Sequence, residues 1–306
     1  ATASGRQDWL VCPYRAVSPE MIDTAIRRLF NISATKKFLA VPASTLAKEE
    51  TRSELSRSLR SGESAYVYFD AKMSGELSIP ATDRSPEFAF DVTIIELCID
   101  HGAPCVGRFG ILEIQTMDFH GSYRAAVRNL RDALRLHPTQ FAQTLRANAQ
   151  WLSEGIEGPN IANVFKRTFY QMMFKFQLGA HDRCSGCVLA IPQAVWDSWQ
   201  RHLGAPVLSP GSGGTFTLAV PGKSLPVPAP AHILIFEPDS AASKTPSPIL
   251  INRVIATNAE AMSYWALEVA PKAAVENIDG ATGLLGLLAR RLKKLWPELA
   301  ESIAAD

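Results

Sequence analysis

The sequence predicts a protein of the α/β or α+β class, because short strand-like segments and longer helical segments follow one another along the chain. Residues 65–69 (AYVYF) have the aromatic and β-branched content of a strand. Residues 88–99 (FAFDVTIIELCI) and 108–115 (RFGILEIQ) indicate two further strands, joined by a loop at 101–107 that contains Gly and Pro. Two strands with such a connection most simply form an antiparallel hairpin.

The region before this hairpin alternates between helical and extended patterns. Pro19 is expected to open a helix that continues to Phe30. Residues 45–60 form a polar, charged segment that predicts a second helix. After the strand at 65–69, a turn at Ser74 and Gly75 leads to an extended piece at 76–79.

The region after the hairpin is mainly helical. Ser122 is a candidate N-cap for a helix that continues beyond Leu134. Further helices are expected at 139–152, 160–178, 193–203 and 284–296, and short strands at 188–191, 215–220 and 232–236. We expect one domain over 1–306, with an exposed Pro/Gly-rich excursion at about 206–230 and a helical C-terminal portion.

Composition narrows the class of protein. Apolar residues make up 47% of the chain and charged residues 20%, which indicates a globular protein rather than a disordered one. No apolar run approaches the roughly 20 residues of a membrane span, so we expect no membrane partner. The net charge of +1 does not suit a protein that coats DNA nonspecifically, although a cleft can still be locally basic. Five cysteines without a secretion signal predict a reducing compartment, the cytoplasm.

Three polar residues interrupt the apolar hairpin. Glu113 and Gln115 are two residues apart on a strand and therefore project to the same side. An antiparallel partner can bring Asp91 beside Glu113, and carboxylate oxygens suit Mg²⁺. The alternatives are a strand with one wet face, or a carboxylate paired with Arg108 or Arg124, because an unpaired buried carboxylate is costly.

Basic residues near the hairpin are candidate DNA contacts. Arg124, Arg128, Arg131 and Arg135 are spaced 4, 3 and 4 apart, which places them on one helix face. Such a stripe can hold phosphates, and the alternative is a solvated face paired with acids. On the 160–178 helix, Lys166, Arg167 and Lys175 are assigned to a polar face as further candidates, while Phe165, Phe169 and Met172 belong to an apolar, core-facing stripe.

Several longer runs resemble one family. They are DWLVCPYRA (8–16), GELSI (75–79), SPEFAFD (85–91), LEIQTMDFHGSY (112–123), EGPNIANVFKRTFYQM (157–172) and AIPQAVWDSWQRHL (190–203). Together these runs closely resemble the NotI-type restriction endonucleases, in unbroken order from about residue 8 to residue 202. Beyond residue 203 the resemblance is weak.

The resemblance implies a PD-(D/E)XK nuclease core, a mixed central sheet flanked by helices. Asp91 matches the family's metal-binding aspartate, Glu113 its glutamate, and Gln115 a glutamine in the position where lysine is usual. Glu76 matches a further acidic position, and Glu87 is a weaker supporting candidate. The implied protein is a bacterial, cytoplasmic type II enzyme that uses Mg²⁺. It is expected to act as a homodimer and to cut both strands of a palindromic, GC-rich site in double-stranded DNA.

The glutamine has a chemical consequence. An amide can orient a water molecule but supplies no positive charge, so the metal is expected to carry the charge that a lysine would otherwise provide. His120 follows the second strand and is expected to be structural rather than a general base. Two other functions remain open: a repair or mobile-element nuclease with the same core and no fixed recognition sequence, and a noncatalytic DNA-binding protein. The intact Asp91, Glu113 and Gln115 set weighs against the last.

The cysteines depart from the family pattern. The family is expected to hold a structural iron with four cysteines in its N-terminal part, and only Cys12 matches one of them here. Cys184 and Cys187 form a C-x-x-C with His181 nearby, which is an incomplete set for a tetrahedral metal site. The structural iron is therefore the least supported of the expectations.

Overall fold

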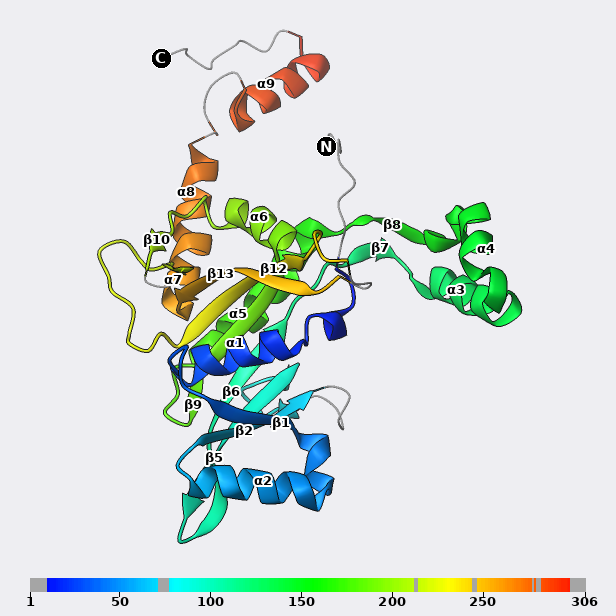
Figure 1. Ribbon diagram of the computed structural model, residues 1–306. Coiled ribbons are helices and arrows are strands. Elements are labelled where there is room, and N and C mark those ends of the chain that lie inside the picture. Colours follow the sequence, from blue (N-terminus) through cyan, green and yellow to red (C-terminus); the bar gives the residue numbers. More distant parts are fainter. Residues whose placement is uncertain are drawn as a thin grey trace.

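A nine-stranded sheet forms the centre of the computed structural model, which describes residues 10–70, 77–211, 214–243, 247–276, 278 and 282–297 (Figure 1). The strands lie in the order β1-β2-β5-β6-β9-β12-β13-β11-β10. The pairs β1–β2, β6–β9, β9–β12 and β11–β13 are parallel, whereas β2–β5, β5–β6, β12–β13 and β10–β11 are antiparallel. The chain therefore has the expected α/β class, with a large mixed sheet flanked by helices.

The strands of this sheet occupy segments throughout the described chain. They are β1 (Phe38–Pro42), β2 (Ser64–Asp70), β5 (Val92–Asp100), β6 (Ala103–Ile114), β9 (Cys184–Pro192), β10 (Ser209–Pro210), β11 (Thr215–Thr217), β12 (Ala231–Pro238) and β13 (Ile249–Thr257). Two small antiparallel sheets pair β3 (Leu77–Ile79) with β4 (Phe88–Phe90), and β7 (Phe119–Gly121) with β8 (Ile156–Pro159).

Helices cover both faces of the large sheet, so that a hydrophobic core lies on each side of it. Because side chains alternate along a strand, neighbouring residues belong to opposite cores. Ile111, Leu189 and Ile233 point to a core shared with α5 (Ile161–Leu178) and α6 (Gln193–His202). Leu112 and Val188, one residue away, point to a core shared with α1 (Pro19–Leu29). This two-residue period is the normal geometry of a strand, and it places every odd-numbered residue near the end of β6 on the α5 face.

The remaining helical segments lie beside or beyond the sheet. They are η1 (Pro13–Arg15), η2 (Ala43–Ala47), α2 (Glu49–Arg60), α3 (Arg124–Leu136), η4 (Pro138–Gln140), α4 (Phe141–Ala147), η5 (Ala149–Leu152), α7 (Ala259–Tyr264), the π-helix η7 (Trp265–Val269), α8 (Ala270–Val275) and α9 (Leu284–Leu295). No helix within the described ranges is both long enough and apolar enough to cross a bilayer.

The hairpin differs from its prediction at both ends. The expected loop at 101–107 is instead a tight turn at His101 and Gly102, whose φ angles of 47° and 81° are those of a two-residue hairpin turn. The strand expected at 88–99 is broken at Asp91, between β4 and β5. The break follows from the contacts of Asp91, whose backbone N–H and side chain both bond to β6 residues.

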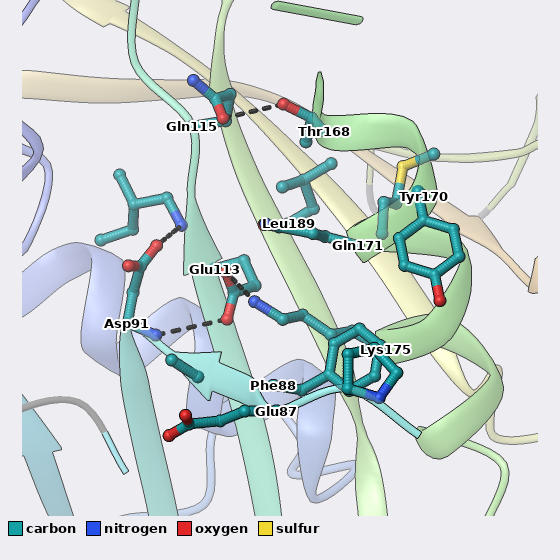
Figure 2. Close-up of a pocket in the computed structure, with 14 residues that line it drawn as sticks. Glu87, Phe88, Asp91, Glu113, Gln115, Thr168, Tyr170, Gln171, Lys175 and Leu189 are labelled. Atoms are coloured by element: carbon teal, nitrogen blue, oxygen red, sulfur yellow. Dashed lines mark hydrogen bonds and ion pairs between the residues drawn. The ribbon is translucent and has the colours of Figure 1, made fainter. Parts of the chain in front are cut away.

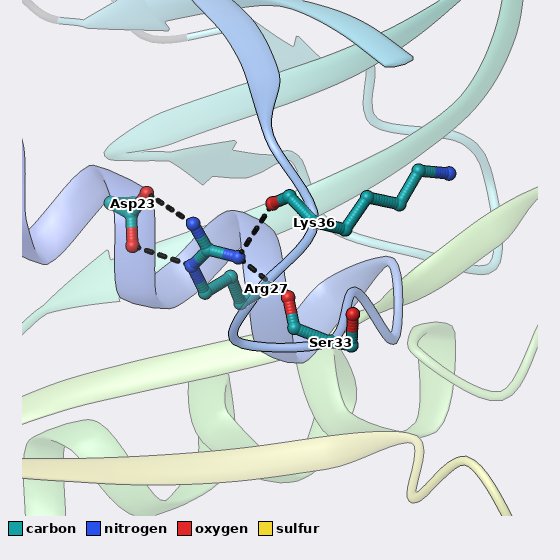
Figure 3. Close-up of polar contacts among 4 residues, drawn as sticks. All are labelled: Asp23, Arg27, Ser33 and Lys36. Atoms are coloured by element: carbon teal, nitrogen blue, oxygen red, sulfur yellow. Dashed lines mark hydrogen bonds and ion pairs between the residues drawn. The ribbon is translucent and has the colours of Figure 1, made fainter. Parts of the chain in front are cut away.

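Arg27 fixes the chain that leaves α1 and enters β1 (Figure 3). Its guanidinium pairs with Asp23 one turn earlier, with Nε to Oδ2 at 2.8 Å. Its Nη1 donates to the carbonyl oxygens of Ser33 and Lys36 at 2.7 and 3.1 Å. One side chain thereby satisfies backbone acceptors on both sides of the turn, which holds β1 in place as the edge of the sheet.

Residues 119–159 form an extension that projects from the body of the protein (Figure 1). The strands β7 and β8 form its stalk, and α3 and α4 lie at its end. At the stalk, Gly121 has a φ of 86°, and an added Cβ would lie 2.1 Å from the carbonyl oxygen of Gly155. Only glycine fits there, which explains how the two strands approach so closely.

Several element boundaries also differ from the predictions. The 45–60 helix begins only at Glu49, after a 3-10 turn. The 139–152 helix is broken into η4, α4 and η5. The 206–230 excursion returns to the sheet as β10 and β11, and the strand expected at 188–191 is the longer, fully buried β9.

Candidate active site

Asp91 and Glu113 meet on the face of the sheet that α5 covers (Figure 2). Val92 pairs with Leu112 in the β5–β6 register, so Asp91 and Glu113 flank this pair on neighbouring strands. The hairpin expected from the sequence therefore brings the two carboxylates together, at the point where β4 passes into β5.

Each carboxylate is held by the backbone of the other strand. The backbone N–H of Asp91 donates to Glu113 Oε1 at 3.2 Å, and the N–H of Ile114 donates to Asp91 Oδ2 at 2.8 Å. This exchange replaces the ordinary strand ladder at that point. The exchange fixes both side chains and uses one oxygen of each, Glu113 Oε1 and Asp91 Oδ2.

Lys175 of α5 supplies the cation at this site. Its Nζ lies 2.6 Å from Glu113 Oε2, and the two side chains are 4% and 14% exposed. The ammonium also lies 5.6 Å from the ring centre of Phe90. Glu113 is thus a paired carboxylate, but neither predicted arginine is its partner, because Arg108 pairs with Glu96 and Arg124 is exposed on α3.

The electrostatics of Glu113 reflect these neighbours. Burial raises the pKa of Glu113 to about 7, and the negative charge of Asp91 adds to the rise. The ammonium of Lys175 and the N–H of Asp91 act in the opposite direction. A second positive charge brought to the pair would relieve the repulsion between the carboxylates and favour the ionised form of Glu113.

Gln115 lies beyond the end of β6 and links the sheet to α5. The hydroxyl of Thr168 donates to Gln115 Oε1 at 2.8 Å, and Gln115 Nε2 donates to the carbonyl oxygen of Thr116 at 2.9 Å. The backbone N–H of Gln115 bonds to the carbonyl oxygen of Ala190 on β9. The amide oxygen of Gln115 therefore links it to α5, and its backbone N–H links it to β9.

These residues border a cavity of about 750 Å³ that opens between β4, the end of β6 and α5. Gln115, Thr168, Gln171 and Lys175 line it together with the carboxylates Glu87, Asp91 and Glu113. Glu87 is exposed at the rim, where it accepts a hydrogen bond from Ser78 Oγ at 2.6 Å. Glu76, the other supporting candidate, lies outside the described residues.

The donor set fits a hard divalent cation. Mg²⁺ keeps several waters and binds proteins through one or two carboxylates, with substrate phosphate oxygens as the other ligands. Asp91 and Glu113 would be its protein ligands here. The Lys175 ammonium already contacts Glu113 Oε2, so a metal ion would have to share this carboxylate with it.

The basic residues predicted to contact DNA lie in different parts of the structure. Arg124, Arg128, Arg131 and Arg135 are exposed on α3, as expected for one face of a helix, but none of them lines the cavity. Their helix lies at the end of the extension (Figure 1).

The three basic residues of α5 also differ from one another. Lys166 is exposed, and Arg167 pairs with Asp118 at 2.5 Å. The assignment of Lys175 to an exposed polar face is wrong, because the residue is buried in the cavity wall. The sequence offers one partial signal: Thr168, Gln171 and Lys175 are polar at helical spacing within a largely apolar stretch, which marks one side of the helix but not the partner of Lys175.

The cysteines form no metal site in the part of the chain that the structure describes. Cys184 and Cys187 are buried in β9, where burial raises the pKa of both thiols, and neither is disulfide-bonded. Cys12 is exposed as a free thiol, and no group of three or more metal-ligating side chains occurs among the described residues. His120 is exposed on β7 and does not line the cavity.

Comparison of the chain with models of known protein families, and with curated proteins, gave no significant match.

Proposed function

We propose that this chain is a Mg²⁺-dependent type II restriction endonuclease with a PD-(D/E)XK core of the NotI type. It would hydrolyse phosphodiester bonds in both strands of a specific, palindromic and GC-rich site in double-stranded DNA. The observation that carries the proposal is the fixed pair Asp91 and Glu113 beside an open cavity. The NotI-like runs around both residues support the choice of nuclease over other metal-dependent hydrolases.

The bound Mg²⁺ would supply positive charge to the phosphate and favour loss of a proton from the attacking water. The residues of the chain position the reactants. Asp91 and Glu113 would hold the cation, and the two backbone hydrogen bonds keep their carboxylates in a fixed geometry. The hydrogen bond between Gln115 and Thr168 ties α5, the opposite wall, to the end of β6. Water then adds across the bond between phosphorus and the 3′ oxygen.

The exposed arginines of α3 are the proposed contacts to the DNA backbone. Replacing both Arg128 and Arg131 with glutamine should weaken binding and flatten its salt dependence, by a slope of about 0.9 for each phosphate that the protein no longer neutralises. The measurement is the affinity for duplex DNA across a range of salt concentrations, with Ca²⁺ in place of Mg²⁺. The matched control is Arg57→Gln with Arg60→Gln, two arginines that are also exposed but lie on α2. An unchanged slope for the α3 variant would assign its arginines to the solvated surface.

A homodimer is the proposed active form, because two-fold symmetry of the protein matches two-fold symmetry of a palindromic site. The test of the function is incubation of the protein with DNA of known sequence, in Mg²⁺ and in EDTA. We expect a reproducible set of fragments in Mg²⁺, with ends that share one short sequence, and intact DNA in EDTA. Mg²⁺-dependent fragments with unrelated ends would instead support a nuclease of repair or mobile elements. Intact DNA in both conditions would contradict any nuclease.

A further inference from the structure

Gln115 cannot contribute charge to the reaction, and its amide is already engaged. Thr168 donates to its oxygen and its nitrogen donates to the backbone of Thr116. The amide keeps a second N–H and a second lone pair, so it can orient a water molecule, but it carries no positive charge. The positive charge that this position lacks must therefore come from another residue or from the metal alone.

Lys175 meets the requirements for that other residue. It lies about two helical turns after Thr168, on the same side of α5. Its ammonium reaches from the opposite wall of the cavity to Glu113 (Figure 2). Three carboxylates line the cavity, Glu87, Asp91 and Glu113, and Lys175 is the one lysine or arginine among the described residues that line it.

The ammonium has unused hydrogen-bonding capacity. A lysine has three N–H donors, and the ion pair with Glu113 is its one polar contact with a described residue. Burying a lysine is costly unless it is paired, and hydrophobic side chains such as Met172 and Phe176 occupy the adjacent positions of α5. Packing alone would be served better by an apolar residue.

We propose that Lys175 is a catalytic residue of this site, whose ammonium donates a hydrogen bond to a non-bridging oxygen of the phosphate that is cut. This inference rests on the proposed nuclease function and corrects one part of it, the expectation that the metal carries the positive charge alone. Before substrate binds, the ammonium neutralises Glu113. A divalent cation that shared Glu113 would weaken the attraction that holds the ammonium there, and the N–H donors of Lys175 would then be available to the phosphate.

The proton and bond changes of the reaction leave Lys175 unchanged. The oxygen of a water molecule forms a bond to phosphorus and releases one proton to solvent. The bond between phosphorus and the 3′ oxygen breaks, and that oxygen takes a proton from solvent water. Lys175 keeps its protons throughout and stabilises the charge that develops on the non-bridging oxygens.

The test is single-turnover cleavage of plasmid DNA by Lys175→Met at pH 8.5 and saturating Mg²⁺. We expect the rate to fall by about 100- to 1,000-fold, the usual loss when one such donor is removed. The affinity for Ca²⁺ should be unchanged or higher, because a competing cation has been removed from Glu113. If Lys175 only stabilised the fold, its replacement would lower both the cleavage rate and the affinity for Ca²⁺. Lys223→Met is the matched control, because it breaks an exposed Lys–Glu pair outside the cavity and should cut at the rate of the unmodified protein.

Two further variants keep the test decisive if Lys175→Met folds poorly. Lys175→Arg keeps the charge and should retain more activity than the methionine variant. Lys175→Ala leaves space beside Glu113, and added methylammonium should raise its rate whereas methanol should not. Suppose that the unmodified protein cuts DNA and Asp91→Asn does not. If Lys175→Met, or Lys175→Ala without methylammonium, then cuts within threefold of the unmodified rate, only the role of Lys175 is overturned. If the unmodified protein does not cut in Mg²⁺, the nuclease function fails as well.

Discussion

Asp91→Asn and Glu113→Gln should each lower the rate of Mg²⁺-dependent DNA cleavage by about 1,000-fold or more, since a metal ion contributes several kcal/mol of transition-state stabilisation. Both replacements keep the size of the side chain and one acceptor oxygen. The new amide at position 91 can still accept from the N–H of Ile114, and the new amide at position 113 from the N–H of residue 91. The strand contacts are thus preserved while a negative charge is removed. The measurement is single-turnover cleavage of plasmid DNA at saturating protein.

The control for these variants is Glu96→Gln. Glu96 lies on β5 like the residues that follow Asp91, but it pairs with Arg108 and does not line the cavity. The Glu96→Gln protein should therefore cleave DNA at the unmodified rate. The Asp91 and Glu113 variants should still bind duplex DNA in Ca²⁺, because the proposed contacts to the DNA backbone lie on α3. Cleavage within tenfold of the unmodified rate by either variant would remove that residue from the active site.

Stability should depend on Glu113 and Lys175 as a pair. Glu113→Gln leaves a buried ammonium without its counterion, and we expect a loss of about 3 kcal/mol in the free energy of unfolding, because breaking one side of a buried ion pair is strongly destabilising. Lys175→Met should cost less, because Glu113 can then take up a proton. The double variant, Glu113→Gln with Lys175→Met, should recover most of the loss. Urea unfolding of the four proteins gives the coupling energy.

The pH dependence of this coupling follows from the pKa of Glu113. Because burial raises that pKa from its ordinary value of 4.5 to about 7, the folded protein holds a proton that the unfolded chain has lost in this range. The protonated carboxyl of Glu113 makes its whole contribution to the free energy of unfolding below about pH 4.5, and this contribution is lost as the pH rises through about 7. The ion pair forms over the same range, so the coupling energy should be larger at pH 8 than at pH 5. Additive losses at pH 8 would show that the two side chains do not interact.

The class of the fold and the convergence of the two carboxylates could be predicted from local patterns. Alternating apolar residues around Glu113 identify a strand, and the antiparallel neighbour that carries Asp91 follows directly in the chain. The break of that strand at Asp91 could not be predicted in the same way. It depends on hydrogen bonds to β6 residues more than twenty positions away.

Lys175 illustrates why the rest of the site could not be predicted. A lysine on a helix is usually exposed, and the pattern of α5 gave no reason to pair it with a strand residue 62 positions earlier. Its burial depends on how α5 crosses β6, which the Gln115–Thr168 hydrogen bond helps to fix. That crossing is a tertiary property. Gln115 lines the same cavity as Asp91 and Glu113, and its role in orienting a water molecule stays a prediction.

Crystals soaked in Mn²⁺, which prefers the same oxygen ligands as Mg²⁺, test the central claim most directly. An anomalous difference map should show manganese within coordination distance of a carboxylate oxygen of Asp91 and of Glu113, and the Asp91→Asn protein should lack that peak. Manganese bound elsewhere, or a Glu113 that keeps only Lys175 as its partner at saturating Mn²⁺, would contradict the account.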